Sequence, residues 1–296
     1  MDNLRDLRQR MRAIEQTLQV TKAMGLISTA KLRKGRRVLM DTEPFFTRIQ
    51  KTMFDILSGV EMRGSKYFAA SGKAEASHTA IVVISSDKGL AGGYNANIFR
   101  EVNLLCEKVK NPVLIVIGSI GYRYFLHSPW LILESVSYRS RLPDLNDAKE
   151  LSEYIISQYI WGLFEEVHIV YTHMYSSIKL APREFQLLPL NKERFQSEFS
   201  LSTGKRQERT FEYLPSKREV FESLIPMYQK GIIYSCLVEA YASEQSARMS
   251  AMDEASKNAE EMLADLKIHY NRIRQTGITQ EMSEIAGGAE ALKGVV

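Results

Sequence analysis

The sequence predicts an α/β protein in which a parallel-sheet domain is inserted between two long helices that pair as an antiparallel coiled coil. Near both ends of the chain, apolar residues recur at alternating steps of three and four, as in helices that pack along a narrow stripe. Between these ends, short apolar runs alternate with helical patterns, which is typical of βαβ units. We expect the N-terminal helix at 1–60, the α/β domain at 78–205 and the C-terminal helix at 212–296.

The N-terminal helix is predicted by a heptad stripe that ends in two small residues, Gly25 and Ser28. The earlier members of the stripe are Leu4, Leu7, Met11, Ile14, Leu18 and Thr21. Basic side chains crowd the flanks of the stripe, and we interpret them as a solvated face. A nucleic-acid surface is disfavoured because aromatic residues do not interleave with them. The segment 64–77, rich in Gly, Ser and Ala, is expected to be a loop.

In the middle of the chain, two apolar runs at 80–84 and 113–117 predict buried strands. Each run is followed by a turn that contains glycine and then by a helical pattern. Further strands are expected at 167–174 and 185–190, with a helix at 147–163. This alternation favours a mostly parallel sheet.

The C-terminal helix is predicted to begin after Pro215 and to run almost to the end of the chain, with Pro226 near its first turn. The residues of its packing stripe recur at alternating steps of four and three, and they are Gly231, Ser235, Val238, Ala242, Gln245, Met249, Met252, Ser256, Ala259, Leu263, Leu266, Tyr270, Ile273 and Gly277. A helix of about 70 residues would be ~105 Å long at about 1.5 Å per residue. Because the N-terminal helix is shorter, part of this helix is expected to protrude unpaired.

Composition and motifs narrow the functional classes. The net charge of +4 does not by itself indicate nucleic acid or an anionic membrane. No apolar run approaches the roughly 20 residues of a membrane helix, and the charged start lacks a signal-peptide core. Membrane contact is therefore expected only through partners. Cys106 and Cys236 form no metal-binding or redox motif, and His168 and His173 lie at odd spacing on one expected strand, pointing to opposite faces. No catalytic, cofactor or metal site is expected.

The segment 87–93 follows an expected strand and precedes an expected helix, so it is open to two interpretations. One is a phosphate cradle. The other is a structural or subunit-contact turn. The segment matches neither G-x-G-x-x-G nor G-x-x-x-x-G-K-[ST], which disfavours the phosphate cradle.

Three segments resemble the gamma subunit of F-type ATP synthases. The first is TKAMGLISTAKL at 21–32, and the second is SDKGLAGGYN at 86–95. The third, at 243–288, contains SEQSARMSAM, YNRIRQ and ITQE. The segments occur in the order and with the separations found in that family.

The resemblance implies an antiparallel coiled coil of the two termini around a Rossmann-like α/β domain, in agreement with the patterns above. It implies a non-catalytic rotor shaft inside a hexamer of alpha and beta subunits, with the epsilon subunit and the c ring at its base. Such a shaft couples ion-driven rotation of the c ring to ATP synthesis or hydrolysis. The resemblance further implies a peripheral membrane location on the cytoplasmic side of a bacterial plasma membrane. The alternative is a nucleotide-binding α/β enzyme whose helical extensions make it oligomerise.

Contact residues for the alpha and beta subunits are implied in the same way. Lys22 and Met24 would face these subunits from the N-terminal helix. The C-terminal helix would add polar contacts from Arg272, Arg274, Gln275, Thr279, Gln280 and Glu281.

Within the α/β domain, the resemblance singles out one turn. Its residues are Asp87, Lys88, Gly89, Gly92 and Asn95. We expect this turn to be structural or to contact another subunit. Neither cysteine fits the regulatory pair of chloroplast relatives, so thiol control is not expected.

Overall fold

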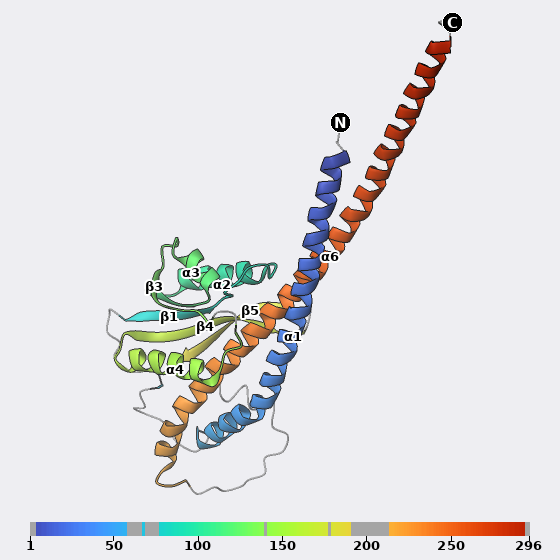
Figure 1. The fold of residues 1–296 in the computed structure, drawn as a ribbon. Helices are drawn as coiled ribbons and strands as arrows, with labels where there is room; N and C mark the ends of the chain where they lie inside the picture. The colour runs from blue at the N-terminus through green and yellow to red at the C-terminus, as the bar shows by residue number, and fades with distance from the viewer. Residues whose placement is uncertain are drawn as a thin grey trace. The chain divides into compact units, whose positions relative to one another are not determined.

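Two long helices connect two compact units in the computed structural model. The structure describes residues 4–57, 67–68, 77–138, 141–176, 179–190 and 213–293. The smaller unit comprises Met1–Ile27 and Met249–Val296, and the larger unit comprises Ser28–Arg248. Helices α1 (Leu4–Leu57) and α6 (Lys217–Lys293) each contribute to both units (Figure 1).

The larger unit contains a five-stranded sheet in the order β3-β2-β1-β4-β5. Its strands are β1 (His78–Ile84), β2 (Pro112–Ile117), β3 (Leu131–Val136), β4 (Phe164–Met174) and β5 (Leu180–Leu188). Strand β1 pairs in parallel with both β2 and β4, β2 pairs in parallel with β3, and β5 runs antiparallel to β4. The strand order therefore reverses direction at β1, so the gap between β1 and β4 is a topological switch point.

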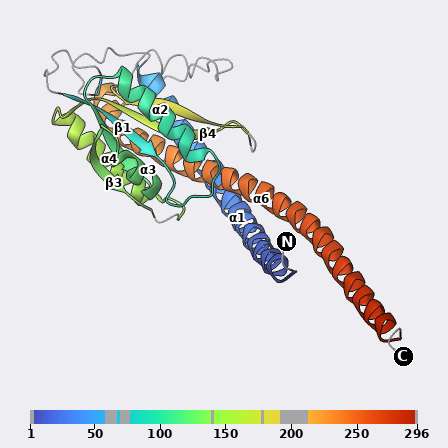
Figure 2. The same ribbon diagram turned by 90° about the horizontal axis from the view of Figure 1, so that it is seen from above.

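Helices cover both faces of this sheet. One face packs against α2 (Tyr94–Lys108) and α3 (Ser119–Phe125), and the other against α4 (Leu145–Ile160) and α6 (Figure 2). Because neither face meets water, the central strands are continuous apolar runs, as the sequence predicted.

The strand predictions were wrong in two places. Strand β3 was missed because it lies at an edge of the sheet, where a half-exposed strand tolerates Glu134 and Ser135. Strand β5 begins at Leu180 and not at 185. Its Pro182 is tolerated because β5 is the other edge strand, with only β4 to pair with.

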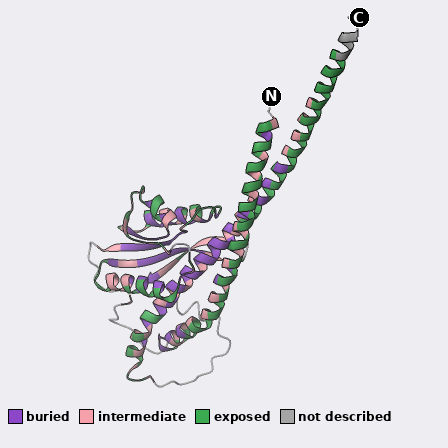
Figure 3. Cartoon of the chain, viewed as in Figure 1, coloured by how far each residue is buried: buried purple, intermediate pink, exposed green. Residues whose placement is uncertain are grey.

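The smaller unit is an antiparallel pair formed by α1 and α6. Ser256 Oγ donates to Thr21 Oγ1 over 2.8 Å, and the Arg8 guanidinium donates to the Tyr270 hydroxyl, so the numbering rises on one helix as it falls on the other. The predicted stripe is the least exposed face of both helices here, as the regular alternation of burial along them shows (Figure 3). The stripe prediction is confirmed for this unit.

In the larger unit the stripe prediction was too narrow. Between residues 231 and 248, α6 is buried on almost every face, and the middle of this helix is largely purple in Figure 3. The buried residues include the polar ones Ser243, Gln245 and Ser246. The reason is that this part of α6 packs against the sheet and also against α1, where Phe46 meets Gly231.

Some expectations concern residues outside the described part of the chain. They include most of the predicted loop at 64–77 and the domain boundaries at 205 and 212, and the boundaries stay predictions. Within the described residues, none of the helices combines the length and the apolar character that crossing a bilayer demands.

Candidate functional site at the carboxyl edge of the sheet

The loop that follows β1 is organised by side chains from its own two ends. The Asn95 carboxamide accepts a hydrogen bond from the Ser86 backbone N–H at 3.1 Å and donates to Ser86 Oγ at 2.7 Å. Ser86 Oγ donates to the carbonyl oxygen of Lys88 at 2.9 Å. Gly92 has a φ of 55°, a conformation that favours glycine, whereas a Cβ added at Gly89 would meet nothing within 4 Å.

Asp87 links this loop to the ends of two neighbouring strands. Its Oδ1 accepts from the backbone N–H of Ser119 at 3.0 Å, just after β2, and from the hydroxyl of Ser137 at 2.7 Å, just after β3. One carboxylate thereby ties together the carboxyl ends of three parallel strands.

Arg248 on α6 holds the same loop from the other side. Its Nη2 donates to the carbonyl oxygens of Lys88 at 2.9 Å and of Gly89 at 3.1 Å, and its Nε donates to Gly89 at 3.3 Å. Its Nη1 lies 2.7 Å from Glu244 Oε1 one turn earlier, and both side chains are 8% exposed. Burial raises the pKa of Glu244 above its ordinary value, while the Arg248 charge opposes that rise.

Further polar contacts join α6 to the elements beside the switch point. Ser243 Oγ donates to the carbonyl oxygen of Thr172 on β4 at 2.9 Å. Glu239 accepts from the backbone N–H of Met174 at 3.1 Å. Tyr94, at the start of α2, donates its hydroxyl to the carbonyl oxygen of Ala240 at 3.2 Å. The crevice in which doubly wound domains bind ligands is thus occupied by α6.

The space left at this edge is small. A cavity of about 30 Å³ is lined by residues that include Ser85, Tyr138 and Glu244. That volume holds about two water molecules, whereas small-molecule sites measure roughly 300–1,000 Å³. The cavity is therefore too small for a nucleotide.

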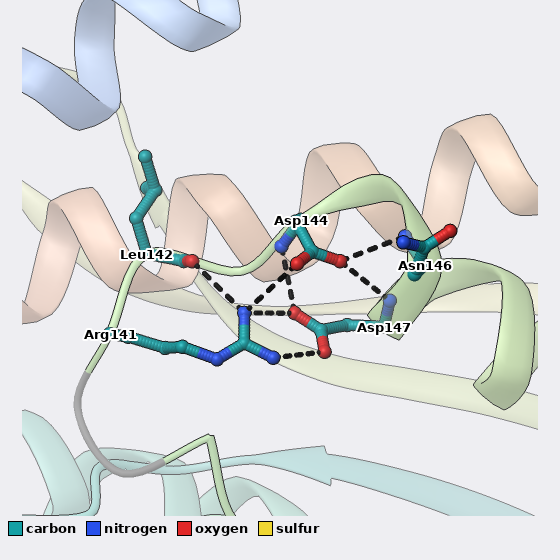
Figure 4. Close-up of polar contacts among 5 residues, drawn as sticks. All are labelled: Arg141, Leu142, Asp144, Asn146 and Asp147. Carbon is teal, nitrogen blue, oxygen red and sulfur yellow. Dashed lines mark hydrogen bonds and ion pairs between the residues drawn. The ribbon is translucent and has the colours of Figure 1, made fainter.

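Arg141 also lines this cavity, but its guanidinium is engaged with the N-terminus of α4 (Figure 4). Its Nη1 donates to Asp147 Oδ2 at 2.7 Å and to the carbonyl oxygen of Leu142 at 3.4 Å. Asp144 and Asp147 form a reciprocal capping box for the first turn of α4. These contacts give Arg141 a structural role at the beginning of α4.

The two cysteines are buried and lie outside this network. Burial raises the pKa of the Cys106 thiol to about 12 and raises that of Cys236 well above its ordinary value. Both thiols therefore stay protonated and weakly nucleophilic near neutral pH.

The structure places the two expected contact residues of α1 on the helix pair of the smaller unit. Lys22 Nζ lies 2.6 Å from Glu260 Oε1, and the two side chains are 55% and 52% exposed. Met24 is half-buried beside the stripe.

The expected contact residues on α6 lie at a different level of the same pair. All six are exposed: Arg272, Arg274, Gln275, Thr279, Gln280 and Glu281. Arg272 follows Glu260, the partner of Lys22, by 12 residues, or about 18 Å of helix. The six residues on α6 follow Tyr270, whose hydroxyl accepts a hydrogen bond from Arg8. Arg8 is close to Leu4, where the described part of α1 begins. The structure therefore separates the expected contacts into two groups and does not bring them together.

The network around Arg248 was not assigned a role from the sequence. Ser243, Glu244 and Arg248 stood within a segment that resembles the gamma family, and Glu244 and Arg248 have the spacing of a helical ion pair. What the sequence did not reveal is that this pair is buried and faces the loop after β1.

Comparisons with known proteins agree over the whole chain. A family model described as ATP synthase matches residues 3–292. The ATP synthase gamma chain of Acetivibrio thermocellus is 39% identical over 295 residues, covering 99% of this chain and all of that protein. That of Ruminiclostridium cellulolyticum is 41% identical over 293 residues, covering 99% of each chain.

Solved structures share the fold. A chain of the central stalk and c-ring structure of the Tetrahymena thermophila mitochondrial ATP synthase has a TM-score of 0.59 and 24% identity, covering 80% of this chain and 99% of that chain. A chain of the Euglena gracilis mitochondrial ATP synthase structure has a TM-score of 0.66 and 16% identity, covering 98% of this chain and 94% of that chain.

Proposed function

The chain belongs to the ATP synthase gamma chain family, and on this premise we propose that it is the central rotor shaft of an F-type ATP synthase. It is a non-catalytic subunit, so the nucleotide chemistry belongs to its partners. The partners that we propose are the hexamer of alpha and beta subunits around the helix pair, and the epsilon subunit and c ring at the α/β domain. In this role the chain couples ion-driven rotation of the c ring to ATP synthesis or hydrolysis.

The observation that carries the proposal is the antiparallel pair of α1 and α6 with its outer faces exposed. A paired helix is stiffer than a single one, and stiffness is what a shaft requires. The pairing stripe is narrow, so most side chains of the smaller unit are directed outward to surrounding subunits.

The part of α6 after Tyr270 supports contact with a surrounding hexamer of alpha and beta subunits. Ile278, Met282 and Ile285 recur at steps of four and three and are 48%, 66% and 73% exposed. An exposed apolar stripe of this kind marks an interaction surface. We assign it, with the polar residues of 272–281, to contacts with the alpha and beta subunits.

Lys22 and Met24 have side chains that suit a shaft surface rotating against neighbouring subunits. The exposed Lys22–Glu260 pair contributes roughly 0–1 kcal/mol, so Lys22 can exchange Glu260 for a carboxylate of a neighbouring subunit as the shaft turns. Met24 is flexible and uncharged, and it can slide along a neighbouring surface without preferring one angle.

The alternative, a nucleotide-binding enzyme, is disfavoured by the position of α6. Its segment around Ser243 and Arg248 occupies the crevice that a nucleotide would need. For the location, we propose the cytoplasmic side of a bacterial plasma membrane, with membrane contact through the c ring. Support comes from the bacterial relatives that match the chain over its full length.

Purification of the native complex tests the proposal. An affinity tag on this chain should retain alpha, beta and epsilon subunits and the c ring in mild detergent, together with ATPase activity. Recovery of the tagged chain alone, or as a homo-oligomer with nucleotide bound, would exclude the rotor role.

A further inference from the structure

We propose that Arg248 is a positioning residue that transmits torque between α6 and the α/β domain by holding the loop after β1. The inference rests on the proposed function as a rotor shaft. It adds to that function a specific contact through which force passes inside the chain.

The geometry suits a contact that bears load. The guanidinium of Arg248 donates to two successive backbone carbonyls, those of Lys88 and Gly89, at 2.9–3.3 Å. A planar fork that binds two fixed acceptors resists both sliding and rotation, which a single rotatable donor does not. Since the acceptors are backbone atoms, they yield less than side-chain acceptors would.

Glu244 fixes the guanidinium in that orientation. It lies one helical turn before Arg248, and the two charges are 2.7 Å apart and almost fully buried. Removing two charges from water is unfavourable, and a buried ion pair is often no more stabilising than an apolar pair of similar size. The pair is therefore better explained by the defined direction it gives to the bonds with the loop than by stability.

The loop passes force on to the sheet because it is itself held. The carbonyl of Lys88, which accepts from Arg248, also accepts from Ser86 Oγ. The neighbouring residue, Asp87, binds the chain after β2 and after β3 through Ser119 and Ser137. A force on Arg248 therefore reaches the ends of three strands.

The position of Arg248 along α6 distinguishes it from the other contacts at this edge. Ser243 and Glu239 bind the end of β4 earlier in the helix. Arg248 is the last residue of the larger unit, and Met249 begins the second segment of the smaller one. The Arg248 bonds are thus at the point where α6 leaves the α/β domain.

The test compares ATP hydrolysis with ATP-driven ion pumping on the same membranes. The double variant Glu244→Gln with Arg248→Gln removes both charges together, so that neither is left buried alone. We expect it to assemble and, with an uncoupler present, to hydrolyse ATP at the wild-type rate. As the ion gradient builds, it should stop pumping at a smaller gradient than wild type, because the contact gives way under load.

Arg248→Lys and a matched control pair sharpen the test. Lysine keeps the ion pair with Glu244 but lacks the fork, so it should show a smaller, load-dependent loss. The control removes another ion pair of α6, Arg218–Glu222, whose charged atoms are 3.1 Å apart and exposed. Arg218→Gln with Glu222→Gln should reach the wild-type gradient.

The outcomes separate this inference from the proposed function. If the wild-type chain is not found with alpha and beta subunits, the rotor role itself fails before any variant is made. If the wild-type complex pumps and the assembled Arg248 variants reach the wild-type gradient, only the torque contact is overturned. Failure of both Arg248 variants to assemble would also overturn it, because the contact would then be needed for folding.

Discussion

At the scale of single residues, two glycines of the helix stripes meet different neighbours. A Cβ added at Gly25 would lie 3.7 Å from the Cβ of Met252, which is an ordinary contact. A Cβ added at Gly231 would lie 2.2 Å from the ring of Phe46. The close approach between α1 and α6 in the larger unit thus requires glycine at 231, whereas position 25 has room for a Cβ.

We expect alanine substitutions at these two glycines to change the free energy of unfolding in opposite directions. Gly25→Ala should stabilise the chain by about 0.5–1 kcal/mol, because alanine restricts the unfolded chain and favours helix. Gly231→Ala should destabilise it by about 1–3 kcal/mol through overpacking against Phe46. Urea unfolding of the purified chain measures both, and a destabilising Gly25→Ala would show that the helices are closer there than the structure indicates.

Met24 provides the residue-scale test of coupling. Met24→Lys adds a charge that can pair with a carboxylate on a facing subunit, and a charge-assisted hydrogen bond of about 1.5–3 kcal/mol is enough to favour one rotary position. We expect the variant to assemble and hydrolyse ATP but to pump fewer ions per ATP. Ion pumping and hydrolysis are measured on one membrane preparation.

Met24→Leu is the control for this substitution, since it keeps the size and apolar character of the side chain. It should pump nearly as well as wild type. A wild-type ratio of pumping to hydrolysis in Met24→Lys would mean that Met24 does not lie on the coupling surface.

At the scale of the elements, the helix pair of the smaller unit combines an apolar stripe with one buried polar contact. Thr21 and Ser256 are 8% and 7% exposed and share a hydrogen bond of 2.8 Å. Each hydroxyl also lies within hydrogen-bond distance of a carbonyl oxygen of its own helix, Thr21 Oγ1 at 3.0 Å from Leu18 and Ser256 Oγ at 2.8 Å from Met252. A shift of register would therefore remove only the bond between the two helices, and we infer that this bond favours the observed alignment.

The stripe itself is tested by two neighbouring substitutions on α6. Leu263 is 6% exposed and Met262 is 56% exposed. Truncating a packed leucine destabilises a protein by about 2–5 kcal/mol. Leu263→Asp should destabilise the chain by more than that, because it also buries a carboxylate. Met262→Asp should have little effect. Helix content and thermal unfolding distinguish them, and equal losses would show that the stripe is misassigned.

At the scale of the whole molecule, the arrangement of α6 in the larger unit excludes a ligand from the switch point of the sheet. We therefore expect no heat of binding when the purified chain is titrated with millimolar ATP, and no ATPase activity. Lys88→Ala should change neither result, because the Lys88 side chain is exposed and it is the backbone carbonyl that α6 uses. ATP binding that disappears in Lys88→Ala would instead favour a nucleotide site.

The sequence by itself determined two kinds of element: a helix that packs against one other helix, and a strand that is buried on both faces. The stripe of α1 from Leu7 to Ser28 could be predicted from the sequence because a paired helix buries one face, and the buried residues then recur at a fixed period. Strands β1 and β2 could be predicted because both of their faces are covered, which makes each strand a continuous apolar run. The family motifs also located the loop after β1 and the segment around Arg248.

Only the tertiary structure decided what depends on several neighbours at once. Edge strand β3 has one partner and a half-exposed surface, so its residues carry no clear period. The burial of α6 between residues 231 and 248 arises from the sheet on one side and α1 on the other, and no local pattern encodes both. For the same reason the bonds of Arg248 to Lys88 and Gly89, about 160 residues away, follow from the fold and not from spacing, since chain order does not specify which distant loop a buried guanidinium meets.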